Sequence, residues 1–173
     1  MSQGVPIVLT ASAVEMSDFR LNPFKAFLGG FPLPLPPFLL RKLLYPPIPD
    51  NPDGTARFAP YGLRKVEALL MEEFGEENVA TVYPSQLGRF VGPDTKVVGI
   101  STMDPLGIGF VSRTYTSIMG LTGRPITRIE FEKLLSHPAL RAYGPKVVVG
   151  GSGAWQIVKA GLQEALGLSL IHI

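Results

Sequence analysis

The sequence contains no cysteine and only two histidines, His137 and His172. Without cysteine, the chain itself cannot form disulfides, zinc ribbons, thiolate nucleophiles or cysteine-held iron–sulfur clusters. Two histidines also leave little material for a metal centre or a catalytic triad.

Strong net charge and long hydrophobic runs are also missing. The net charge is only +2, and no cluster of Lys and Arg with interleaved aromatics occurs, so nucleic acid is not an expected partner. The apolar run at 26–40 is interrupted by four prolines. It is shorter than the roughly 20 residues of a spanning helix, so no membrane span is expected. No charged segment followed by an apolar core opens the chain, and the expected location is cytoplasmic.

Apolar residues make up 46% of the 173 residues, which is enough for one folded domain with a buried core. Strands alternate with helical patterns, and the strands are nearly continuous apolar runs. The sequence therefore predicts the α/β class, with a Rossmann-like doubly wound parallel sheet of four to five strands. The predicted strands are 5–11, 79–83, 95–102 and 145–150, and the predicted helices are 61–74, 128–135 and 155–166.

A long proline-rich segment, 12–60, separates the first strand from the first helix and carries ten of the 17 prolines. Because proline lacks a backbone donor, we expect neither a long helix nor a central strand there, and we interpret the segment as a loop insertion. Gly75 and Gly167 are predicted to end the helices before them. Thr127 is predicted to cap a helix, with Glu130 completing a capping box.

Small residues lie at the ends of three predicted strands, at 10–12, 101–103 and 150–153. In sheets of this class, ligands bind beyond the carboxyl ends of the strands. Glycine allows close approach of the backbone to a ligand, and hydroxyls can donate or accept hydrogen bonds. A glycine turn that only redirects the chain is an equally supported alternative. The candidate binding residues are Ser101, Thr102 and Met103 after the third strand, and Gly150, Gly151, Ser152 and Gly153 after the fourth.

The segment 150–154 differs at one position from the G-x-S-x-G elbow, which would make Ser152 a nucleophile. That motif requires an acid and then a histidine downstream, and only His172 follows. A serine hydrolase is therefore a weaker alternative. Dinucleotide and phosphate-loop sites are not predicted, because no G-x-G-x-x-G follows the first strand and no G-x-x-x-x-G-K-[ST] occurs.

Four segments, 8–24, 59–75, 92–112 and 147–157, resemble the N-terminal cobalamin-binding domain of B12-dependent radical SAM proteins. The resemblance extends over 1–166. It implies that Ser101 matches the serine of a Ser-x-Leu element in which Met103 replaces leucine. It also implies that Gly150 and Gly151 match a Gly-Gly pair, and that these small residues line the slot for the cofactor's nucleotide tail.

Relatives of that family that ligate cobalt from below carry Asp-x-His-x-x-Gly after the first strand, and this sequence lacks it. The resemblance therefore implies cobalamin in a base-off form with no protein histidine on cobalt, and no metal ligand in this chain. The loop 103–111 and the segment 19–60 are expected to flank the corrin. Four apolar residues of that segment are expected to cover the protein's own core, or alternatively the corrin or a partner domain: Phe31, Leu33, Leu35 and Phe38.

Radical SAM chemistry needs a Cys-x-x-x-Cys-x-x-Cys motif, which this chain lacks. The resemblance thus implies a fragment that is not catalytic alone. The [4Fe–4S] cluster, S-adenosylmethionine, and methyl transfer or related radical chemistry would belong to the missing radical SAM domain of the same polypeptide. We predict that 167–173, which resembles a translated sequencing adaptor, is a tail outside the domain. Two alternatives stay open: a native tail that forms an edge strand, and a non-catalytic Rossmann-like module without cofactor.

Overall fold

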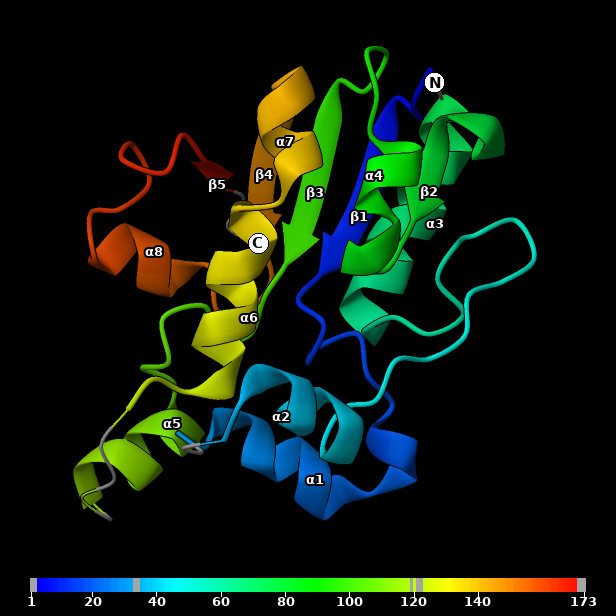
Figure 1. The fold of residues 1–173 in the computed structure, drawn as a ribbon. Helices are drawn as coiled ribbons and strands as arrows, with labels where there is room; N and C mark the ends of the chain where they lie inside the picture. Colours follow the sequence, from blue (N-terminus) through cyan, green and yellow to red (C-terminus); the bar gives the residue numbers. More distant parts are fainter. Residues whose placement is uncertain (1–2, 33–34, 119, 121–122, 171–173) are drawn as a thin grey trace.

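The computed structural model describes residues 3–32, 35–118, 120 and 123–170 (Figure 1). Five parallel strands form one sheet in the order β2-β1-β3-β4-β5. The α/β class and the doubly wound parallel sheet predicted from the sequence are confirmed. The strands are β1 (Ile7–Ala11), β2 (Val79–Thr81), β3 (Val97–Ser101), β4 (Lys146–Gly150) and β5 (Ser169–Leu170).

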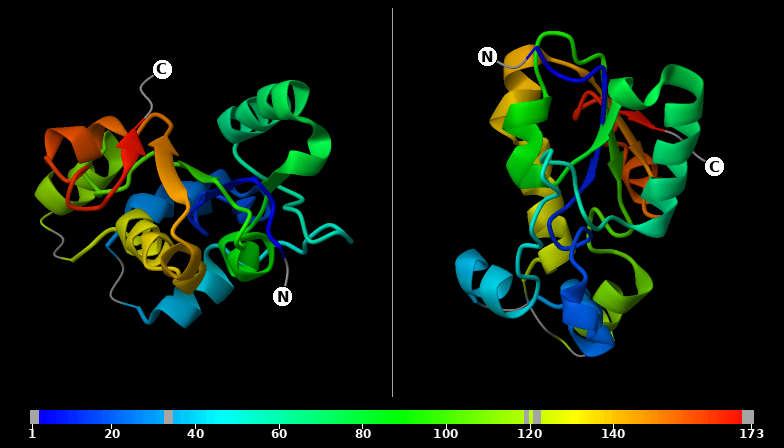
Figure 2. Two further views of the ribbon diagram at one scale, coloured as in Figure 1. Left: turned by 90° about the horizontal axis from the view of Figure 1, so that it is seen from above. Right: turned by 90° about the vertical axis from the view of Figure 1, so that its right-hand side faces the viewer.

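Helices cover both faces of the sheet (Figure 2). α3 (Tyr61–Phe74) lies on one face, and α8 (Trp155–Lys159) lies on the same side near β4. The helices α4 (Leu87–Phe90), α6 (Ile126–Leu135) and α7 (Pro138–Tyr143) lie on the other face. Among the described residues, no helix combines the length and the hydropathy needed to cross a bilayer.

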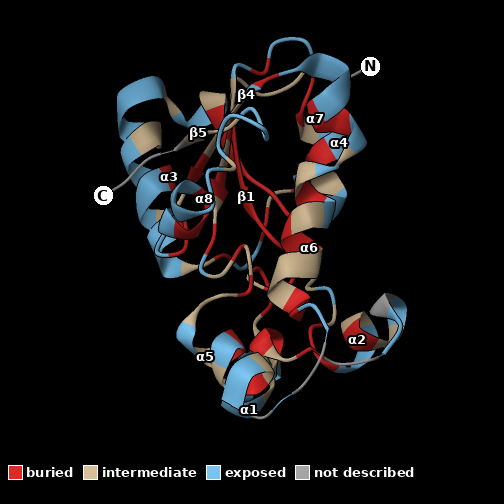
Figure 3. Ribbon diagram, turned by 90° about the vertical axis from the view of Figure 1, so that its left-hand side faces the viewer, coloured by how far each residue is buried: buried red, intermediate tan, exposed pale blue. Residues whose placement is uncertain are grey.

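Buried residues concentrate in the strands and on the inward sides of the helices (Figure 3). The larger core lies under α4, α6 and α7, and a smaller core joins α3 to β1 and β2. Burial of this apolar surface is the main favourable term in folding. The larger core includes Val8, Val98, Ile100, Phe131, Leu134 and Val149, and the smaller one includes Leu9, Met16, Leu63, Val79 and Tyr83.

The proline-rich segment forms short helices below the carboxyl ends of the strands (Figure 1). They are α1 (Pro23–Phe27), α2 (Pro37–Leu43) and the 3₁₀ turns η1 (Phe19–Leu21) and η2 (Leu28–Gly30). The longest helix in the described part of the segment has seven residues, and no strand occurs in that part; the interpretation as a loop insertion stays a prediction. Leu33 lies outside the described residues. Phe31 packs on the ring of Tyr115 at 4.4 Å between centroids, whereas Phe38 is 73% exposed and does not cover the core.

Two predictions about helix ends are wrong. α6 begins at Ile126 after Pro125, so Thr127 lies inside the helix, and its hydroxyl has no hydrogen-bond partner in the described part of the chain. Glu130 is buried and accepts a hydrogen bond from Tyr45 instead of completing a capping box. α8 ends at Lys159 and not at residue 166, because Gly161 turns the chain at a φ of 64°. The remaining loop helices are α5 (Phe110–Arg113), a π-helical turn η5 (Thr114–Ile118), and the 3₁₀ turns η3 (Glu76–Asn78) and η4 (Pro84–Gln86).

Candidate functional site: a groove and a rim cavity

The loops after β3 and β4 contact each other at the carboxyl edge of the sheet. Ser101 pairs with Gly150 in the strand register. The amide of Thr102 donates to the carbonyl of Gly150 at 2.9 Å, and the amide of Gly153 donates to the carbonyl of Thr102 at 2.9 Å. The structure thus brings the two predicted groups of site residues, 101–103 and 150–153, to one edge.

This loop contact explains why two of the candidate positions are glycine, and the explanation requires no ligand. Gly151 has a φ of 94°, and a Cβ atom there would lie 2.6 Å from the carbonyl oxygen of Thr102. A Cβ atom at Gly153 would lie 2.2 Å from the carbonyl oxygen of Met103. Both positions need glycine for backbone packing, as the turn-only interpretation of the sequence holds.

An apolar groove of about 200 Å³ runs along the sheet beside α3. It exists because α3 packs over β1 and β2, while Gly99 and Gly150 place no side chains on the neighbouring part of the sheet. The hydroxyl of Ser101 is the only polar side-chain group in its lining, and no hydrogen bond to it is found in the described chain. The lining residues are Leu9, Gly62, Leu63, Val66, Gly99, Ile100, Ser101, Val148, Gly150 and Gly151.

A second opening of about 460 Å³ lies at the rim of the sheet, beyond the loop contact. Residues of the proline-rich segment and of the loop after β3 line most of it. Met103 and Ser152 line it, and Thr102 and Gly153 are buried in the loop contact. The other lining residues are Val14, Glu15, Phe19, Ala26, Phe27, Gly29, Gly30, Asp104, Gly109, Phe110, Val111 and Thr127.

Glu15, which the sequence did not identify as a site residue, joins the loop after β1 to the loop after β3. Its Oε1 accepts hydrogen bonds from the amide of Met103 at 2.7 Å and from the hydroxyl of Thr102 at 3.2 Å. Its Oε2 has no hydrogen-bond partner among the described residues. Burial raises the pKa of this carboxyl, and the hydrogen bonds from Met103 and Thr102 only partly oppose that rise. An acidic residue within the apolar segment 11–16 was the one sequence signal for this position.

Replacing Glu15 by glutamine should remove a pH dependence of stability. When folding raises the pKa of a carboxyl, the free energy of unfolding of the protein falls as the pH rises from the ordinary pKa of 4.5 toward the raised pKa. The glutamine side chain keeps an oxygen acceptor for the amide of Met103 and cannot ionise. At pH 8 we expect the Tm of Glu15→Gln to exceed that of the wild type by at least about 2 °C, the shift that roughly 1 kcal/mol produces.

Thermal unfolding between pH 4.5 and pH 8 measures this effect. Glu72→Gln is the matched control, because Glu72 is exposed on α3. Parallel pH profiles for the wild type and Glu15→Gln would show that the Glu15 carboxyl titrates normally, contrary to the expectation.

The arrangement does not supply a base for Ser152. Ser152 is exposed, and no hydrogen bond joins it to a histidine in the described chain. His137 caps α7, where its Nδ1 accepts from the amide of Ala139 at 3.2 Å, and His172 lies outside the described residues. Within the described residues, no three His, Asp or Glu side chains gather closely enough to hold a metal ion.

Comparison of the chain with protein-family models, with curated proteins and with solved structures finds no match in any of the three. A functional interpretation therefore depends on the geometry of the groove and the rim cavity and on the resemblance of the sequence segments.

Proposed function

We propose that this chain is a cobalamin-binding domain of a B12-dependent radical SAM enzyme and binds cobalamin base-off, without a protein ligand on cobalt. One observation carries the proposal: a narrow apolar groove adjoins a wider rim cavity at the carboxyl edge of the sheet. Gly151 lines the groove, and the next residue, Ser152, lines the cavity. The two openings therefore lie on either side of a single loop.

The two openings suit the two parts of base-off cobalamin, which are an extended nucleotide tail and a wide macrocycle. Together their volumes fall within the range of about 300–1,000 Å³ that is typical of cofactor pockets. In the groove, Ser101 would donate a hydrogen bond to a ring nitrogen of the tail, since a hydroxyl can serve as a donor. Gly150 and Gly151 would leave room for the tail, and Met103 and Ser152 would border the macrocycle.

Cobalamin supplies methyl-transfer or related radical chemistry in the intact enzyme, whereas this chain supplies binding and orientation. The chain has no cysteine, so we assign the [4Fe–4S] cluster and S-adenosylmethionine to a radical SAM domain of the same polypeptide. We also propose that the protein is cytoplasmic, as expected from the sequence.

Reconstitution with hydroxocobalamin tests the proposal. We expect one equivalent to stay with the protein through gel filtration and its visible spectrum to change from the base-on to the base-off form. Cobinamide, which lacks the nucleotide tail, is the matched ligand and should bind more weakly because it leaves the groove empty. Elution of free cobalamin, or equal retention of both corrinoids, would contradict a groove that recognises the tail.

The cofactor-free module remains the second candidate, because backbone packing alone explains Gly151 and Gly153. That candidate predicts no retention of either corrinoid. The serine hydrolase predicts labelling of Ser152 by a fluorophosphonate, and we expect none, since Ser152 has no base among the described residues.

A further inference from the structure

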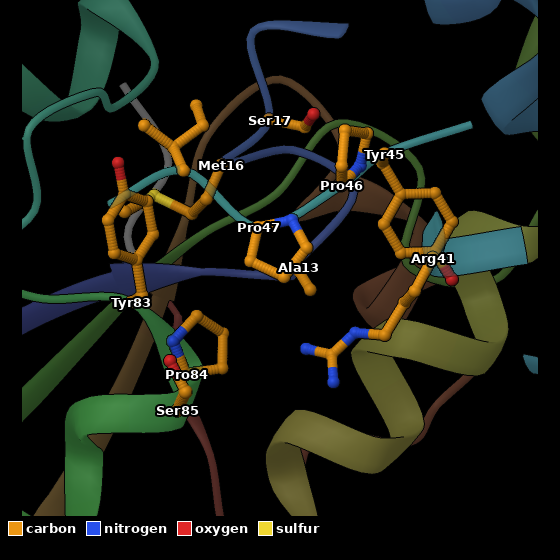
Figure 4. Close-up of a pocket in the computed structure, with 11 residues that line it drawn as sticks. Ala13, Met16, Ser17, Arg41, Tyr45, Pro46, Pro47, Tyr83, Pro84 and Ser85 are labelled. Carbon is orange, nitrogen blue, oxygen red and sulfur yellow. The ribbon is translucent and has the colours of Figure 1, made fainter. Parts of the chain in front are cut away.

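A separate cavity of about 180 Å³ lies between α2, η4 and α6. It borders the sheet face that α6 covers, whereas the groove borders the face that α3 covers. A smaller space of about 40 Å³ adjoins it and shares three lining residues, Arg41, Pro84 and Ser85 (Figure 4). The larger cavity is lined by Arg41, Pro84, Ser85, Glu130, Lys133, Leu134 and His137.

Among the described residues, Arg41 is a partly buried cation without a carboxylate partner. Three arginines of the described chain are partly buried: Arg41, Arg64 and Arg128. Arg64 pairs with Glu67 at 2.6 Å and Arg128 with Glu132 at 2.8 Å, but no ion pair joins Arg41 to any described residue. Figure 4 shows the guanidinium of Arg41 pointing toward Pro84 and Ser85. Charges withdrawn from water are normally paired, and no carboxylate among the described residues lies within ion-pair distance of this guanidinium.

Other hydrogen-bond donors line the same cavity. Lys133 and Ser85 also line the cavity, and both residues are exposed. His137 accepts the amide of Ala139 at Nδ1, so its neutral ring carries hydrogen on Nε2. Burial lowers the pKa of His137, and the ring is therefore neutral near pH 7.

One carboxylate, Glu130, also lines the cavity. It is 3% exposed, and its Oε1 accepts a hydrogen bond from the hydroxyl of Tyr45 at 3.1 Å. Against the two cations Arg41 and Lys133, this single anion leaves one positive charge in excess. The charge balance favours an anionic occupant.

We propose that this cavity binds a tetrahedral oxyanion, either free phosphate or the phosphate group of a monoester. The donors come from three separate parts of the chain, namely α2, η4 and the end of α6. Donors that surround a cavity suit an anion with oxygens in several directions, whereas a carboxylate uses donors in one plane. The site is independent of the cobalamin proposal, because it shares no lining residue with the groove or the rim cavity.

Calorimetric titration with inorganic phosphate at constant ionic strength tests this site. We expect saturable binding by the wild type and a Kd at least about tenfold higher in Arg41→Gln. Arg57→Gln is the matched control, because Arg57 is exposed and lies outside the cavity, and it should bind phosphate as the wild type does. Glycerol phosphate distinguishes free phosphate from a phosphate monoester as the natural ligand. If glycerol phosphate binds more tightly than inorganic phosphate, the site is assigned to a monoester.

Acetate and sulfate complete the experiment. Sulfate should compete with phosphate, and acetate should not. Circular dichroism establishes whether Arg41→Gln folds, and Lys133→Gln serves as the second variant, with an expected loss of affinity of several-fold. Absence of saturable binding, equal affinity of the wild type and both folded variants, or equal binding of acetate would each overturn the proposal.

Discussion

Replacing Gly153 by alanine is expected to destabilise the domain by about 3 kcal/mol or more, because the new Cβ collides with backbone. The added atom would lie 2.2 Å from the carbonyl oxygen of Met103 and 2.3 Å from its carbon. Neither loop can withdraw easily, since the amide of Gly153 donates to Thr102 and the amide of Thr102 donates to Gly150. Urea unfolding followed by circular dichroism measures the loss.

Gly88→Ala is the matched control for this substitution. Gly88 lies in α4, its φ is not positive, and no atom lies within 4 Å of the Cβ position. Alanine also favours helix over glycine by up to about 1 kcal/mol. We therefore expect unchanged or slightly raised stability for Gly88→Ala. Equal unfolding midpoints for the two variants would mean that the loops after β3 and β4 are not packed as described.

Apolar periodicity and helix-ending residues predicted the bounds of an element correctly where both indicated the same residue. The helix 61–74 has the predicted bounds, since its periodicity agrees with the stop at Gly75, which has a φ of 91°. The start of α6 was predicted two residues late, because Thr127 resembled a cap, whereas Pro125 is the residue that precedes the helix. The fifth strand, Ser169–Leu170, pairs with β4, so part of the predicted tail joins the sheet.

The position of the candidate residues at the strand ends was predictable for a similar reason. Any doubly wound parallel sheet places the residues after β3 and β4 at one edge, so Ser101 and Gly150 needed only the strand assignment. The separation into a groove and a cavity was not predictable. Glu15 contacts Met103 across 88 residues, and Gly62 joins the groove only because α3 packs beside β1. Such contacts depend on tertiary packing, which no short segment encodes.

Replacing Gly62 by leucine is expected to weaken cobalamin binding at least about 100-fold without loss of folding. Gly62 lines the groove, and no atom lies within 4 Å of its Cβ position. It precedes Val66 by four residues, so a side chain at 62 lies on the same face of α3 as Val66, which also lines the groove. Leucine would therefore occupy the space that the proposed function assigns to the nucleotide tail. Leucine is also a better helix former than glycine, so the free protein should unfold at the same or a higher temperature.

Gly88→Leu introduces the same side chain in α4, at another helical glycine with an open Cβ position, and should bind hydroxocobalamin like the wild type. Cobinamide separates blocking of the groove from damage to the rim. Because cobinamide lacks the tail, the wild type and Gly62→Leu should bind it with nearly equal affinity. If Gly62→Leu binds hydroxocobalamin with wild-type affinity, the groove is not the tail site. If it loses cobinamide to the same extent as hydroxocobalamin, the substitution has disturbed the rim cavity, and the separate roles assigned to the two openings are wrong.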